Sequence, residues 1–147
     1  MTGWRLGYTA APKEIADAID TIQSHSTSNP TTFAQYGAIA ALTGDQSEIT
    51  DMVEEYNIRR QYVLGRLNSI ANVSTIEPDG AFYFLINIEK TGIKSVNFAE
   101  KLLSRMQVAT VPGVAFGNDH SIRISYATSL PTIKEGLDRL EEFCKAH

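Results

Sequence analysis

The chain contains 147 residues, of which 43% are hydrophobic and 20% are charged, and its formal net charge is −4. A chain of this length is expected to form one domain and to bury a core without disulfides. Its content of glycine and proline is ordinary and no repeat period is present, which excludes collagen-like, disordered and solenoid folds. The weakly acidic charge balance argues against nucleic acid or an anionic membrane as the main partner.

Cysteine and histidine are too few to build a disulfide framework or a metal site. The single cysteine, Cys144, is expected to be a buried or half-buried thiol in the last helix. Three scattered histidines without a CxxC motif do not favour zinc, so no metal is expected. The sequence contains neither an apolar run of about 18 residues nor a signal-peptide pattern. These features predict a reduced, cytoplasmic setting without a membrane partner.

The first 44 residues predict helices but almost no sheet. In chain order we expect a short strand or extended segment over residues 4–10, a helix from Pro12 to about Gln23, a polar loop over 24–30 and a helix over 31–42. A lone strand leaves its backbone hydrogen-bonding groups unpaired. This segment is therefore expected to be a piece of something larger.

After Gly44 the pattern predicts one long amphipathic helix. Asp45 and Glu48 have the spacing of a capping box. Apolar residues then recur at spacings of three, four and seven: Ile49, Met52, Val53, Tyr56, Val63, Leu64, Leu67 and Ile70. The charged residues on the opposite face, Arg60 and Arg66 among them, are expected to lie in solvent.

From Val73 onward, strand patterns alternate with helix patterns. In chain order we expect a strand over 81–88, a helix over 95–106, strands over 108–111 and 122–127, and a last helix capped by Ser129 or Thr132. The strand 81–88 is an almost unbroken apolar and aromatic run, which predicts burial on both faces. The alternation predicts an α+β layer sandwich.

Two arginines stand among hydrophobic neighbours. Arg5 lies beside Trp4, and Arg123 lies between two isoleucines of a predicted strand. An arginine in such a setting needs an anionic partner, because burial of an unpaired charge is costly. A guanidinium binds phosphate or carboxylate through two parallel hydrogen bonds. A structural ion pair within the chain remains the alternative for each arginine.

Five ordered stretches resemble pyridoxal-phosphate aminotransferases of fold type I, and most of all the bacterial aspartate aminotransferase subgroup. They are MTGWRLGY at 1–8, Ser28-Asn29-Pro30 before a helix that contains Gln35, DGAFYF at 79–84, Val111-Pro112-Gly113 with Phe116-Gly117, and IRISYAT at 122–128. The resemblance covers the whole chain. It implies pyridoxal 5'-phosphate as cofactor of the complete enzyme, and an amino acid and a 2-oxo acid as substrates.

The resemblance also implies roles for particular residues. Arg5 matches the arginine that binds the cofactor phosphate, and Arg123 matches the arginine that binds the α-carboxylate of the substrate. Ser28 and Asn29 lie in a loop that approaches the active site of the partner subunit in the family, so they are candidates there. A homodimer is therefore expected, in which residues 1–44 pack on a second copy.

Two departures from the family pattern stand out. The Schiff-base lysine of the family precedes the methionine that matches Met1 by four residues, so we expect it to lie upstream and assign no catalytic residue in this chain. The six lysines of the chain are outside that motif and are expected on the surface. His120 stands where relatives often have glycine. It is either a loop residue without a role or the sign of a shifted carboxylate site.

The sequence is thus interpreted as the C-terminal portion of an aspartate-type aminotransferase that is inactive alone. Residues 1–44 would form the C-terminal segment of the large cofactor-binding domain, and residues 45–147 the small domain, with a short, mostly antiparallel sheet covered by helices. Two alternatives remain. One is another fold type I enzyme, such as a C–S lyase or a cyclopropane-forming synthase. The other is a non-catalytic α+β interaction module.

Overall fold

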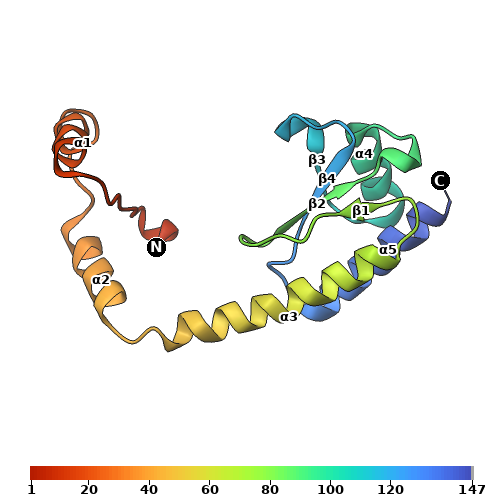
Figure 1. Cartoon of the computed structure of the whole chain (residues 1–147), viewed down its shortest axis with the longest axis horizontal. Helices are drawn as coiled ribbons and strands as arrows, with labels where there is room; N and C mark the ends of the chain where they lie inside the picture. The colour runs from red at the N-terminus through yellow and green to blue at the C-terminus, as the bar shows by residue number, and fades with distance from the viewer. Residues whose placement is uncertain (147) are drawn as a thin grey trace. The chain divides into compact units, whose positions relative to one another are not determined.

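The computed structural model describes residues 1–146. The chain divides into two compact units, the first of residues 1–50 and the second from residue 51 onward (Figure 1). Each unit is described by itself. Within residues 1–146, no helix is long and apolar enough to cross a membrane.

The first unit consists of short helical elements joined by irregular segments. They are the 3-10 turn η1 (Thr2–Trp4), the helices α1 (Lys13–Ser26) and α2 (Thr32–Thr43), and the start of α3 (Ser47–Ser69). The predicted strand at 4–10 does not form, because no other strand is present in this unit to pair with it. Helix α1 also runs three residues past the predicted end, where the Ser24 hydroxyl donates to the Thr21 carbonyl at 2.8 Å.

The helices of the first unit leave their apolar faces uncovered. Of all residues in α1 and α2, only Ala34 is buried. Ile22 is 69% exposed and Tyr36 is 71% exposed. Contiguous apolar faces that are exposed in this way mark surfaces that pack against other protein. This agrees with the expectation that the segment does not form a complete core.

The second unit is a four-stranded sheet with three helices. Its elements are α3 from Asp51 on, β1 (Ser74–Thr75), β2 (Tyr83–Asn87), η2 (Glu89–Thr91), α4 (Ser95–Met106), β3 (Val111–Pro112), η3 (Gly113–Phe116), β4 (Ser121–Ser125) and α5 (Leu130–Lys145). The strand order is β1-β2-β4-β3, and all three pairings are antiparallel. The predicted α+β fold with a short antiparallel sheet is confirmed.

The core lies on one face of this sheet. Phe84 and Ile86 of β2 and Ile122 of β4 form one cluster with side chains of α3, α4 and α5. On the opposite face of β2, Leu85 is 45% exposed. The prediction that this strand is buried on both faces is therefore wrong. An antiparallel strand needs only one covered face, and alternate side chains divide between the two.

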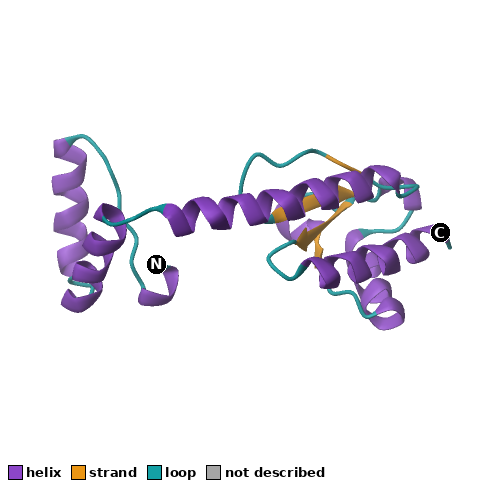
Figure 2. Ribbon diagram, turned by 90° about the horizontal axis from the view of Figure 1, so that it is seen from below, coloured by secondary structure: helices purple, strands orange, loops and turns teal. Residues whose placement is uncertain are grey.

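Ion pairs join α3 to α5 at the edge of this core. Figure 2 shows the ribbons of these two helices beside each other. The Arg66 guanidinium lies 2.6 Å from Asp138 and 2.9 Å from Glu141 on α5, and it also donates to the Tyr62 hydroxyl. Arg60 pairs with Glu77 at 2.6 Å. Both arginines were expected in solvent, and both instead hold α3 to other segments.

Candidate functional site

Arg5 follows the turn η1 in the first unit. Its backbone has a left-handed φ of 57°, and its N–H donates to the Thr2 carbonyl at 3.0 Å. The turn is held by Trp4, whose ring contacts Phe33 of α2 edge-to-face at 6.2 Å. A Cβ added to Gly37 of α2 would lie 3.1 Å from Trp4 Cζ3, so the tryptophan lies close against this helix. Packing of Trp4 thus fixes the backbone that carries Arg5.

The surroundings of Arg5 suit a phosphate group. Its side chain is exposed and forms no ion pair or hydrogen bond with residues 1–146. Gly3 and Gly7 flank it, and a Cβ added to either would meet nothing within 4 Å. A free guanidinium between two residues without side chains leaves room for a bulky dianion to approach the backbone. These residues fit the phosphate of the implied cofactor.

Ser28 and Asn29 lie on the turn that follows α1. Ser28 has a left-handed φ of 62°, and its N–H donates to the Gln23 carbonyl at 3.0 Å. Asn29 lines a hollow of about 410 Å³ together with Gly7 and Tyr8. The first unit therefore brings the segment after Arg5 beside Asn29, whereas the Arg5 side chain forms no hydrogen bond or ion pair with Ser28 or Asn29.

Arg123 lies on the uncovered face of the sheet in the second unit. Its register partners are Leu85 of β2 and Val111 of β3, and cross-strand partners share a face. The side chain is half-buried. No acidic residue of the described chain pairs with it. A structural ion pair, the alternative left open for this arginine, is not formed.

Two aromatic rings contact the Arg123 guanidinium. Its Cζ lies 4.2 Å from the centroid of the Tyr83 ring and 4.7 Å from the centroid of the Phe116 ring. Both distances are within the range of cation–π attraction. Tyr83 begins β2, whereas Phe116 ends η3, so two separate elements converge on the arginine.

The turn that carries Phe116 is tied to the start of α4. Ser95 is fully buried, and its hydroxyl donates to Asp119 at 2.7 Å and accepts from the Val114 N–H at 3.3 Å. The hydrogen bond from Ser95 lowers the pKa of Asp119. His120, noted as a departure, lies 3.2 Å from Lys94 Nζ through its Nε2. His120 thus joins this turn to Lys94, the residue just before α4.

The turn before β2 is held from two sides. The Tyr126 hydroxyl donates to the Ala81 carbonyl at 2.9 Å, and the Arg60 guanidinium donates to the Pro78 carbonyl at 3.2 Å. Ala81 has a left-handed φ of 60°, a conformation that costs an L-residue about 1–2 kcal/mol. Because Ala81 is not extended, strand β2 begins at Tyr83 rather than at residue 81, where the sequence predicted its start.

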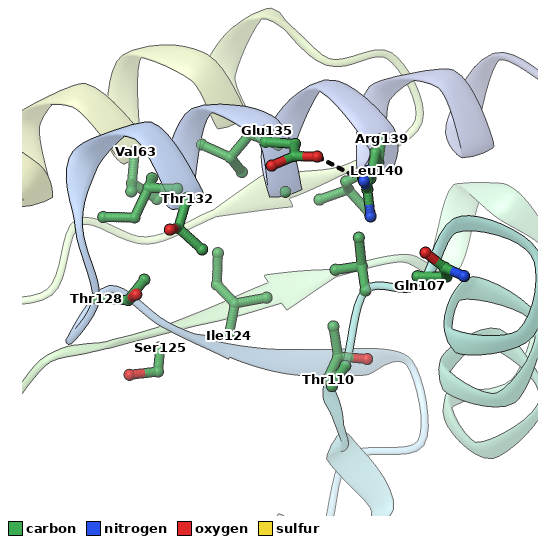
Figure 3. Close-up of a pocket in the computed structure, with 15 residues that line it drawn as sticks. Val63, Gln107, Thr110, Ile124, Ser125, Thr128, Thr132, Glu135, Arg139 and Leu140 are labelled. Carbon is green, nitrogen blue, oxygen red and sulfur yellow. Dashed lines mark hydrogen bonds and ion pairs between the residues drawn. The ribbon is translucent and has the colours of Figure 1, made fainter.

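A second hollow, of about 290 Å³, lies on the helix side of the sheet (Figure 3). Figure 3 shows Ile124 projecting from β4 toward α5, where Glu135 and Arg139 form an ion pair. The buried hydroxyl of Thr110 at its edge has no hydrogen-bond partner among residues 1–146. Arg123 does not line this hollow, which lies on the other face of the strand.

Comparison with known proteins places the chain in a family. Residues 1–140 match the model described as aminotransferase class I and II. The aspartate aminotransferase of Bacillus sp. strain YM-2 is 43% identical over 150 residues, which cover 99% of this chain and 38% of that protein. The chain therefore belongs to the class I and II aminotransferases. It spans about 38% of the length of this curated relative.

Solved structures agree with this assignment. An aspartate aminotransferase from Thermotoga maritima has a TM-score of 0.89 at 41% identity, covering 99% of this chain and 37% of that one. An aromatic aminotransferase from Pyrococcus horikoshii OT3 has a TM-score of 0.91 at 40% identity, covering 99% and 40%. The resemblance found in the sequence motifs is thereby confirmed.

Sequence reasoning missed the two rings that contact Arg123. Nothing in the spacing of Phe116 and Arg123 predicts their contact, because it depends on the path of the turn between β3 and β4. Alternation along β2 could have placed Tyr83 on the face of Arg123, once the antiparallel register was known. Within residues 1–146, no cluster of metal-binding side chains is present.

Proposed function

We propose that this chain is the C-terminal part of a pyridoxal-phosphate-dependent aminotransferase of the aspartate type. The complete enzyme exchanges an amino group between an amino acid and a 2-oxo acid. Residues 1–44 are the C-terminal segment of its large domain, and residues 45–147 are its small domain. Family membership supports the reaction class, and the names of several similar relatives support aspartate as a substrate.

Arg123 binds the α-carboxylate of the substrate. The observation that carries this role is its half-buried guanidinium, which no acidic residue of the described chain neutralises. A carboxylate from outside can therefore use two of its N–H groups at once. Such a two-point contact fixes the orientation of the substrate Cα, and a fixed orientation favours removal of its proton.

Arg5 binds the phosphate of the cofactor. The fixed turn behind Arg5 and the open space beside Gly3 and Gly7 support this role. When bound, pyridoxal phosphate supplies the electron sink for the amino acid's Cα. The chain's own contribution is to anchor the phosphate end.

Ser28 and Asn29 act at the subunit boundary of a homodimer. Their exposed turn and the uncovered apolar faces of α1 and α2 support an interface with other protein. In the dimer, residues 1–44 pack on a second copy of the chain. Size-exclusion chromatography with light scattering tests this, and a monomer would contradict it.

No residue of this chain is proposed as the proton-transferring base. All six lysines are exposed, at positions 13, 90, 94, 101, 134 and 145. The 147 residues alone should therefore give no transamination of aspartate above the rate of free pyridoxal phosphate. Measurable turnover by the isolated chain would contradict the assignment.

The decisive experiment uses the aminotransferase that carries this chain. Aspartate and a 2-oxo acid are supplied, and formation of the new amino acid is followed. Arg123→Lys should raise KM for aspartate by at least about 10-fold, because a lysine cannot make the two-pronged contact. Lys134→Arg, on the far side of the sheet, is the control and should leave KM unchanged. An unchanged KM in Arg123→Lys would refute the proposal.

A further inference from the structure

We propose that Tyr83 and Phe116 are positioning residues that hold the Arg123 guanidinium ready for a substrate carboxylate. This inference rests on the role proposed for Arg123. It concerns how a flexible side chain on an open sheet face is kept in one place. The two rings restrain the guanidinium without occupying the N–H groups that bind the substrate carboxylate.

The contact geometry carries the first step. The Arg123 Cζ lies 4.2 Å from the Tyr83 ring and 4.7 Å from the Phe116 ring. Tyr83 is the register partner of Ser125, two residues along β4, so its ring is the diagonal neighbour of Arg123 on the same face. Phe116 comes from the turn after β3. The arginine is thus contacted from two directions.

Ring contacts differ chemically from the ion pair that such an arginine would otherwise form. An acidic partner would accept from the guanidinium N–H groups and compete with the substrate carboxylate. An aromatic face attracts the cation through its quadrupole and accepts no strong hydrogen bond. Tyr83 and Phe116 therefore restrain Arg123 while its five N–H donors stay available.

The restraint matters because a free arginine side chain has many rotamers, and its rotamer entropy falls when the guanidinium is fixed by a ligand. A guanidinium that two rings already hold has lost part of this entropy before the substrate binds. Substrate binding therefore has a smaller entropic cost. The rings are themselves supported. Tyr83 packs against Phe82 at 4.5 Å between ring centroids, and the turn of Phe116 is tied to Ser95.

The Tyr83 hydroxyl takes no part in this function. It forms no hydrogen bond within the described chain, whereas the Tyr83 ring lies against the Arg123 guanidinium. Tyr83→Phe should therefore behave as the parent protein, whereas Tyr83→Leu should not. The Phe116 ring is 48% exposed, so its removal should leave the core intact.

The first experiment follows the arginine directly by NMR in the 147-residue chain. The Nε–Hε signal of Arg123 is identified by its loss in Arg123→Lys. Ring currents should displace this signal, and its {¹H}–¹⁵N NOE should indicate a restrained side chain. In Tyr83→Leu and Phe116→Leu the displacement and the NOE should both decrease. An undisplaced, mobile signal in the parent chain would overturn the proposal.

The second experiment measures binding of maleate, a non-reacting dicarboxylate, to the aminotransferase that carries this chain. Tyr83→Leu and Phe116→Leu should each raise Kd by about 2- to 30-fold, with KM for aspartate rising in parallel and kcat changing less. Tyr83→Phe, which keeps the ring, should bind maleate as the parent protein does. Tyr62→Leu, which removes a ring beside Lys134 instead, is the matched control and should leave Kd unchanged.

The outcomes separate this inference from the proposed function. If Arg123→Lys leaves maleate binding unchanged, the role of Arg123 itself is wrong. If Arg123→Lys weakens binding but both ring variants bind as the parent does, only the positioning role is overturned. Tyr83→Met and Phe116→Met also lack a ring but have an unbranched, adaptable side chain, and they replace the leucine variants if those unfold.

Discussion

Gly113 should be far less tolerant of alanine than the other glycines of the family motifs. It is buried after β3, and a Cβ there would lie 2.3 Å from the Asn118 carbonyl oxygen and 2.4 Å from the Ser121 carbonyl oxygen. Both atoms are backbone, so they cannot rotate away. Gly113→Ala therefore forces the turn between β3 and β4 to move by about 1 Å to reach ordinary contact.

The cost follows from that displacement. Overpacking of a buried site costs about 1–3 kcal/mol. The turn also loses the hydrogen bond from the Asn118 N–H to the Gly113 carbonyl, now 3.0 Å long, at about 1 kcal/mol. We expect the free energy of unfolding to fall by about 2–4 kcal/mol, a large part of the total for a domain of this size.

Two other glycines are matched controls. Gly117 has a left-handed φ of 82° but open space at its Cβ position, so alanine there should cost about 1–2 kcal/mol. Gly80 has neither constraint, and alanine there should change stability by less than about 0.5 kcal/mol. Urea unfolding followed by far-UV circular dichroism measures all three. Tryptophan fluorescence is unsuitable because Trp4, the single tryptophan, lies in the first unit. A cost for Gly113→Ala no larger than that for Gly117→Ala would refute the steric argument.

Three further predictions concern single contacts in the second unit. Tyr126→Phe should lower the free energy of unfolding by about 1 kcal/mol, measured by urea titration, because the hydrogen bond to Ala81 is lost. Because the pKa of Asp119 is lower in the folded chain than in the unfolded chain, its carboxylate stabilises the fold above the unfolded pKa, and this stability is lost as pH falls through the folded pKa. Ser95→Ala removes the hydrogen bond that lowers this pKa. The variant should therefore be less stable at neutral pH, and in acid unfolding its stability should depend less on pH below about 4. Burial raises the pKa of Cys144 to about 11, so its reaction with a thiol reagent at pH 8 should be slow until urea unfolds the chain.

The sequence was sufficient for features that depend on local pattern. The predicted apolar stripe of the long helix is buried at Val63, Leu67 and Ile70 but exposed at Ile49, Met52 and Val53. The predicted apolar face of the last helix is buried in the structure. Arg5 and Arg123 were singled out because an arginine among apolar neighbours needs an anionic partner, and their roles remain proposals. Such features are visible along the chain because helices and strands repeat at fixed periods.

Features that join distant segments could not be predicted in this way. Arg66 reaches Asp138 and Glu141, which are 72 and 75 residues away, so its charge gave no sign of an ion pair. Arg60 and Glu77 are likewise joined only by the fold. A charged helix face is usually solvated, and the exceptions depend on which helix packs beside it.

The aromatic run 81–88 illustrates how one strand can serve two purposes. Its composition suggested burial on both faces, whereas its alternation divides the side chains. Phe84 and Ile86 build the core, and Tyr83 faces Arg123 on the open side. Substitutions at adjacent positions should therefore separate stability from ligand binding. Phe84→Leu should lower the free energy of unfolding because it leaves a cavity in the core, and it should leave the Arg123 side chain restrained. Tyr83→Leu should release the Arg123 side chain and change the free energy of unfolding less. If both substitutions lower the free energy of unfolding and release Arg123 to the same extent, the two faces are not independent.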